Sequence, residues 1–181
     1  FSQDKSTPYP HVTNVDSHHA TVHTPQELFT ALTDQASKGH CLMKGELKRH
    51  LENESRKGQS DRNAYSDLLV LDIDNLTLPQ MPFGNGQLTK LHVEQIANTV
   101  VSALPQELHD VTYIAQASAS FGLKPTYSLH IFFMLTVPLP PKTIKLWLQQ
   151  MNHSTELFNS QCSLSVNGQS LKYPLDISVA D

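Results

Sequence analysis

The sequence predicts an α+β fold built on a β-α-β-β-α-β unit, the ferredoxin-like arrangement that RNA-recognition motifs also use. Two observations predict it. From residue 68 onward, four apolar runs have the two-residue period of half-buried strands, and two helical stripes separate the first run from the second and the third from the fourth. The chain has 181 residues, of which 39% are hydrophobic, so it is long enough to bury a sizeable core.

The first predicted element is a helix over residues 24–39. Thr24 is a suitable N-cap, and Glu27 stands three residues later to close a capping box. The run "HCLMKG", residues 40–45, predicts a short strand. Residues 44–63 are rich in Lys and Arg and lead directly into the first apolar run.

The ferredoxin-like unit occupies the rest of the chain. Its predicted elements are, in order, strand 68–74, helix 90–104, strand 110–118, strand 128–135, helix 140–152 and strand 171–179. In this topology the sheet order is 4-1-3-2, so the first strand lies between the third and the fourth and is antiparallel to both.

Polar residues interrupt three of these strands with matching parity. Asp72 and Asp74 share one face of the first strand, Ser128 and His130 share one face of the third, and Asp176 faces away from the apolar residues of the fourth. Successive strand residues point to opposite faces, so the apolar sets can cover the helices while the polar sets stay on the open face. Antiparallel neighbours then bring three carboxylates, an imidazole and a hydroxyl to one place.

Three clustered carboxylates repel one another unless a cation lies among them. Oxygen ligands with open positions suit Mg²⁺ or Mn²⁺, and such an ion beside a histidine and basic residues suits phosphoryl or nucleotidyl transfer. The pattern therefore predicts a divalent-metal site formed by Asp72, Asp74 and Asp176. The plainer alternative is a polar strand end that enters a loop.

Basic residues near these strands are candidate phosphate contacts. Arg56 and Arg62 belong to the basic segment that enters the first strand, and guanidinium groups match phosphate oxygens. Lys124 lies in the hairpin loop that leads to Ser128. The alternative is that the segment is a solvated, mixed-charge surface and the hairpin a simple turn.

The ordered motifs "DID" (Asp72, Asp74), "SLH" (Ser128, His130) and "LD" (Asp176) resemble those of the archaeo-eukaryotic primase superfamily, in particular the primase-polymerases of plasmids, phages and other mobile elements. The resemblance covers roughly residues 40–181 and implies a DNA-dependent nucleotidyltransferase, a primase and/or DNA polymerase acting in replication. It implies that the three acids hold two divalent metal ions. It also implies that His130 contacts the phosphates of the incoming nucleotide, assisted by Ser128.

The resemblance also implies a domain organisation and partners. An N-terminal α/β lobe over residues 24–66 would follow a polar arm over 1–23 and pack on the catalytic unit over 67–181, which is expected to continue past its last residue. The implied partners are a single-stranded DNA template and nucleoside triphosphates, with a helicase, as a further domain or a separate protein, outside these residues.

Other function classes fit less well. A net charge of −4 argues against a broadly basic surface, two distant cysteines argue against a zinc site and favour a cytoplasmic setting, and no apolar run is long enough to span a membrane. "LDIDNLTL" is similar to the haloacid-dehalogenase phosphatase motif but has Leu76 where Thr or Val is needed. A rolling-circle initiator nuclease needs a second histidine beside His130. A primase-fold module without activity, which only binds nucleic acid, stays open as the main alternative.

Overall fold

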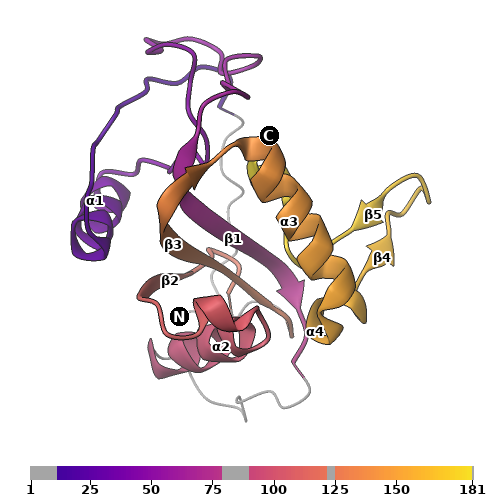
Figure 1. Cartoon of the computed structure of the whole chain (residues 1–181). Coiled ribbons are helices and arrows are strands. Elements are labelled where there is room, and N and C mark those ends of the chain that lie inside the picture. The colour runs from indigo at the N-terminus through magenta and orange to yellow at the C-terminus, as the bar shows by residue number, and fades with distance from the viewer. Residues whose placement is uncertain (1–11, 79–89, 122–124, 181) are drawn as a thin grey trace.

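The computed structural model describes residues 12–78, 90–121 and 125–180, and the fold is of the α+β class (Figure 1). Its main sheet has three antiparallel strands in the order β1-β3-β2. These strands are β1 (Ser66–Leu76), β2 (Tyr113–Ala117) and β3 (Tyr127–Leu139). The predicted order of the first three strands is therefore confirmed.

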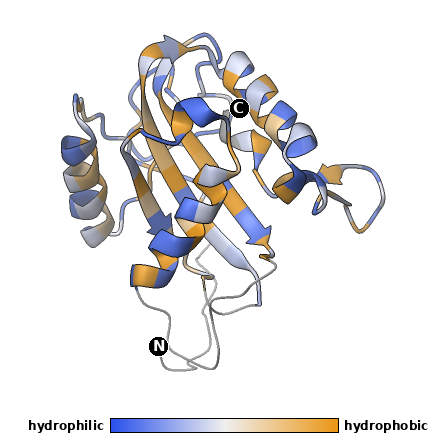
Figure 2. Cartoon of the chain, turned by 60° about the horizontal axis from the view of Figure 1, so that its bottom comes forward, coloured by the Kyte–Doolittle hydropathy of each residue, from blue (hydrophilic) through white to orange (hydrophobic). Residues whose placement is uncertain are grey.

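Helices cover both faces of this sheet. The larger core lies between the sheet and the helices α2 (Lys90–Ser102), α3 (Pro141–Ser154) and α4 (Glu156–Asn159). It buries the odd-numbered apolar residues of β1 and β3, namely Leu69, Leu71, Ile73, Leu129, Ile131 and Phe133. Figure 2 shows that hydrophobic residues follow the strands and the helix faces turned toward them.

A smaller core covers part of the opposite face. There Leu28, on α1 (Pro25–Ser37), packs with Val70 of β1 and Phe132 of β3. These two strand residues have the same parity as Asp72 and His130, so the N-terminal segment covers one part of the polar face and leaves the rest for the candidate site. This cover explains why Val70, before the acidic motif, and Phe132, after His130, are apolar although they lie on the polar face.

The α1 helix begins as the sequence predicts. The Thr24 hydroxyl accepts a hydrogen bond from the Glu27 amide at 3.2 Å, and the Glu27 carboxylate reaches back to accept one from the His23 amide, just before the N-cap, at 2.7 Å. The strand predicted over residues 40–45 is wrong: these residues lie in loops and turns. Leu42 is exposed there, so the run buries no face that would fix a strand.

The described part of the N-terminal arm is tied to the basic segment rather than free. The Val15 amide donates to the Glu54 carbonyl at 2.8 Å, and the Ser17 amide donates to the Leu51 carbonyl at 2.9 Å. Leu51 is fully buried beneath this contact. The segment that leads into β1 is thus held in place by residues that precede α1.

The strand predicted over residues 171–179 is wrong over most of its length. Leu171–Lys172 is β5, which pairs only with β4 (Ser163–Leu164), and Ile177–Ala180 is a 3₁₀ helix, η2. Between them a single bridge joins Leu175 to Ile73, at the edge of β1 where the fourth strand was expected. Pro174 has no amide hydrogen for a ladder, which is one reason that the pairing stops.

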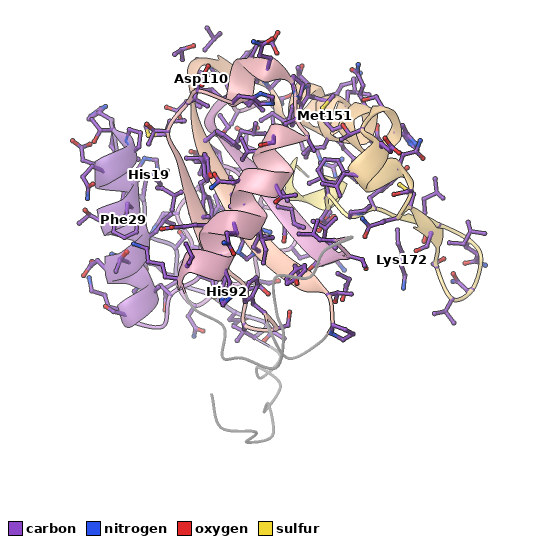
Figure 3. All side chains as sticks on the ribbon, turned by 90° about the horizontal axis from the view of Figure 1, so that it is seen from below. His19, Phe29, His92, Asp110, Met151 and Lys172 are labelled. Atoms are coloured by element: carbon purple, nitrogen blue, oxygen red, sulfur yellow. The ribbon has the colours of Figure 1, made fainter. Side chains whose placement is uncertain are left out.

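The β4–β5 hairpin projects from the body of the fold on the side away from α1. Figure 3 shows Lys172 on this hairpin and Phe29 on α1 at opposite sides of the molecule. A short 3₁₀ helix, η1 (Gln106–Leu108), connects α2 to β2. Neither the hairpin nor η1 contributes to the polar face described next.

Candidate functional site

The candidate site is centred on Asp72, whose neighbour on β3 is His130. The two residues are directly paired across the antiparallel strands, and His130 Nε2 lies 3.2 Å from Asp72 Oδ1. The Asp72 side chain is 13% exposed and that of His130 is 26% exposed. The predicted convergence of these two motif residues on one face is therefore found in the structure.

The second partner of Asp72 comes from the N-terminal segment. Lys44 Nζ forms a hydrogen bond and ion pair with Asp72 Oδ2, from a loop that follows α1. Each oxygen of the Asp72 carboxylate thus has a nitrogen partner, one from Lys44 and one from His130. Sequence reasoning placed Lys44 in a basic segment but did not connect it with Asp72.

These partners keep Asp72 ionised. Burial by itself raises the pKa of the Asp72 carboxyl, but hydrogen bonds from His130 and Lys44, together with their charges, outweigh it and hold the pKa below the usual range. A carboxylate that stays charged in a partly buried place is suited to binding a cation.

The lowered pKa predicts a pH-dependent contribution to stability. Because the folded-state pKa lies below the unfolded value of about 3.9, the contribution is complete above that value and is lost as the pH falls through the folded-state pKa. Urea unfolding at pH 6 and at about pH 3 should therefore show a larger loss of stability in the parent protein than in Asp72→Asn. Equal losses in the two proteins would contradict this coupling.

The third acid, Asp176, reaches Asp72 through the main chain. The Asp176 amide donates to the Asp72 carbonyl at 2.8 Å, and the Asp74 amide donates to the Pro174 carbonyl at 3.0 Å. The Asp176 carboxylate accepts hydrogen bonds from the amide and hydroxyl of Ser178 at 2.8 and 2.7 Å, at the start of η2. The backbones of the acids are therefore neighbours, while two of the carboxylates are engaged with other groups.

Asn152 holds this last segment against β1. It is fully buried on α3, and its side-chain amide donates to the Leu175 carbonyl at 2.9 Å while its carbonyl oxygen accepts from the Leu175 amide at 3.1 Å. Leu175 thus pairs with β1 through the bridge to Ile73 and with α3 through Asn152. Sequence reasoning missed Asn152, for which an asparagine on the apolar stripe of a helix was the available signal.

The Ser128 side chain makes a structural hydrogen bond inside the fold and does not lie on an open surface. It is buried, and its hydroxyl accepts a hydrogen bond from the Asn75 amide at 3.1 Å. Asn75 has a positive φ of 54° at the irregularity where β1 and β3 shift register after Asp74. Ser128 therefore fixes the bulge that turns the end of β1, and the exposed Asp74 side chain lies directly before it.

The predicted phosphate contacts differ in their placement. Arg62 lines a pocket beside the site, together with Lys44, Ser60, Leu68 and Val70. Arg56 is exposed on a turn closed by the Gln59 amide and does not line this pocket. Lys124 lies outside the described residues. Of the two candidates that the structure describes, Arg62 is the one that shares a pocket with Lys44, the partner of Asp72.

The residue types suit a divalent cation, although the side chains are not gathered around one. Among residues 12–78, 90–121 and 125–180, no group of three or more His, Cys, Asp or Glu side chains is placed to hold a metal ion. Carboxylate oxygens are the ligands that Mg²⁺ and Mn²⁺ take, and Asp72 is held charged. An ion bound through Asp72 would compete with the Lys44 ammonium group for Oδ2, and an ion bound through Asp176 would meet a carboxylate that already accepts two hydrogen bonds from Ser178.

The described residues contain no helix that is long and apolar enough to cross a membrane. Comparison of the chain with protein-family models, with curated proteins and with solved structures gave no match.

Proposed function

We propose that this chain is a DNA-dependent nucleotidyltransferase, a primase and/or DNA polymerase, with the fold of the archaeo-eukaryotic primases. The observation that carries the proposal is the charged Asp72, paired with His130 across β1 and β3 and hydrogen-bonded through its carbonyl to the Asp176 amide. Acids from "DID" and "LD" and the imidazole from "SLH" thus come from three separate segments to one edge of a sheet.

In this proposal Asp72, Asp74 and Asp176 hold two divalent ions, Mg²⁺ or Mn²⁺. Such ions, when bound, lower the pKa of the attacking 3′-hydroxyl and neutralise the departing pyrophosphate. Asp72 supplies a fixed negative charge at the centre of β1, and the exposed Asp74 supplies a second at its end. The main-chain bond from Asp176 keeps the third carboxylate within the same neighbourhood.

His130 is proposed to contact the incoming triphosphate. Its Nε2 is directed at Asp72, so Nδ1 is the nitrogen that remains for a phosphate oxygen. A neutral imidazole that donates from Nε2 can only accept at Nδ1, whereas the imidazolium donates from both nitrogens. Contact with Asp72 and with a phosphate oxygen at once therefore requires the imidazolium form of His130.

Arg62 is proposed as a phosphate contact that takes no part in the chemistry. Arg62→Ala is expected to weaken binding of single-stranded DNA and to flatten its salt dependence by about 0.7 in the log–log slope, the value for one lost phosphate contact. Arg56→Ala removes the same charge from the same segment at a position outside the pocket, so it is the matched comparison. Binding titrations from 50 to 200 mM salt measure the slope for both variants. Equal slopes in Arg62→Ala and the parent would mean that Arg62 contacts no phosphate and that the basic segment is a solvated surface.

A second candidate function is a primase-fold module that binds nucleic acid and has no activity. The engaged carboxylates of Asp72 and Asp176 favour this candidate, because each already has a partner within the chain, Lys44 for Asp72 and Ser178 for Asp176.

Incorporation of labelled nucleotide on a single-stranded template separates the two candidates. The assay is run with and without a primer, in Mg²⁺ and in Mn²⁺, with ribo- and deoxynucleotides. Template-dependent synthesis is the expected result, and it excludes the inactive module. Template binding without synthesis under every condition would contradict the proposed enzyme and favour the module.

A further inference from the structure

Among the residues that the structure describes, Lys44 is the partner of Asp72 that comes from outside the sheet motifs. Its side chain is 28% exposed, and its ammonium group contacts Asp72 Oδ2, the carboxylate oxygen that His130 does not take. The two charged groups come from segments that are far apart in the sequence, a loop after α1 and the middle of β1. The contact is therefore made by the tertiary fold and not by local geometry.

A partly buried carboxylate is unfavourable without a compensating charge. Lys44 supplies that charge from within the chain, and it does so on an atom that a divalent ion would also need. Two cations on one carboxylate oxygen repel each other strongly at such short range. Occupation of Oδ2 by Lys44 and by a metal ion are therefore competing states of the site.

We propose that Lys44 is a tethered counter-ion of Asp72, which holds the carboxylate charged and oriented and leaves Oδ2 when a divalent ion binds there. This inference rests on the proposed function only for the metal ion, since the lysine contact exists without it. Lys44 thereby sets the metal affinity of the site: a stronger lysine contact means weaker binding of the ion.

The surroundings give the displaced ammonium a place to go. Lys44 lines the same pocket as Arg62, together with the acidic Glu46 and Asp61, so after release its ammonium group stays in a pocket that already holds a second cation. There it can pair with an anionic phosphate, which is the charge that a nucleotide brings together with its metal ion. A single movement of the Lys44 side chain then takes its ammonium group from Asp72 to the phosphate.

The test is the affinity for Mn²⁺ alone, measured by the electron paramagnetic resonance signal of the free ion, at low ionic strength and without nucleotide. The parent is compared with Lys44→Met, which keeps the length of the side chain but not its charge, and with Lys44→Arg, which keeps the charge. Lys48→Met is the matched control, because exposed Lys48 lies in the same segment and contacts the Gly58 carbonyl. It makes the same change in net charge away from Asp72.

Lys44→Met is expected to bind Mn²⁺ about tenfold more tightly than the parent, while Lys44→Arg and Lys48→Met stay within about twofold. Without metal, Lys44→Met is expected to unfold at a lower temperature than the parent, and Mn²⁺ should raise its midpoint by more than it raises the midpoint of the parent. Circular dichroism confirms that each variant is folded before titration.

Equal or weaker Mn²⁺ binding by Lys44→Met would overturn the inference, as would an equal gain in Lys48→Met. If only the enzyme proposal were wrong, nucleotide incorporation would be absent and the Lys44→Met shift in Mn²⁺ affinity would still be seen. Mn²⁺ binding that Asp72→Asn does not weaken would overturn both the metal site and the role of Lys44.

Discussion

Replacing Asp72 by asparagine is expected to lower template-dependent nucleotide incorporation about a thousandfold or more. Asparagine keeps the size of the side chain and one of its two acceptor oxygens, but it removes the negative charge between Lys44 and His130. Metal-assisted charge stabilisation contributes several kcal/mol to such reactions, and about 4 kcal/mol corresponds to a factor of a thousand in rate. Single-turnover incorporation with saturating nucleotide measures the loss.

Asp67→Asn is the matched control for this prediction. Asp67 is exposed at the beginning of the same strand, so the substitution makes the same chemical change away from the site. Activity close to that of the parent is expected from this control. Retention of more than a tenth of the parent activity in Asp72→Asn would show that the chemistry is centred elsewhere.

Replacing Asn152 by leucine is expected to destabilise the folded protein by about 3 kcal/mol. The substitution leaves the amide and carbonyl of fully buried Leu175 without their side-chain partners, and each unsatisfied buried group costs about 1–3 kcal/mol. For a chain of this size the loss corresponds to a fall of about 6–12 °C in the unfolding midpoint. Urea unfolding followed by circular dichroism gives the free energy directly.

Asn159→Leu provides the comparison for Asn152. The side-chain amide of Asn159 also donates to a backbone carbonyl, that of His153 at 2.9 Å, but the residue is exposed. Water can replace that hydrogen bond, so the expected change stays within about 0.5 kcal/mol. If Asn152→Leu were as stable as Asn159→Leu, the bridge to Ile73 would suffice to hold Leu175 and the role given to Asn152 would be wrong.

The elements with strong local signals could be predicted from the sequence. Thr24 and Glu27 mark the beginning of α1, because a capping box depends only on residues three apart in the chain. The alternation of Asp72 with Leu71 and Ile73 fixes which side of β1 is buried, because a strand has a strict two-residue period. Once β1 and β3 are predicted to be neighbours, the same period predicts that Asp72 and His130 lie on one face.

The final segment could not be predicted in the same way. Residues 171–179 alternate as a strand does, but Pro174 interrupts the ladder and the Asp176 carboxylate caps a turn of 3₁₀ helix instead. The free side of Leu175 pairs with the Asn152 side chain rather than with another strand. In each case a tertiary contact competes with strand pairing, and such contacts produce no periodic pattern in the sequence.

The Lys44 contact was hidden for a related reason. Lys44 lies in a segment of loops and turns, where the direction of a side chain depends on the path of the whole segment. That path is set near Lys44 by hydrogen bonds within the segment, from the Asp61 amide to the Glu46 carbonyl and from the Lys48 amide to the Gln59 carbonyl. A basic segment before β1 was visible in the sequence, but which of its lysines meets the acid was not.

The hydrogen bond from the Asp176 amide to the Asp72 carbonyl joins two residues that are added to the chain at different times during synthesis. Synthesis proceeds at about 5–20 residues per second, so the roughly one hundred residues between the two acids take about 5–20 s to add. During that interval the growing chain already carries Lys44, Asp72 and the basic segment but not the last acid. A chain of the proposed enzyme that stops before Asp176 would lack both this hydrogen bond and the third proposed metal ligand, so it is expected to be inactive.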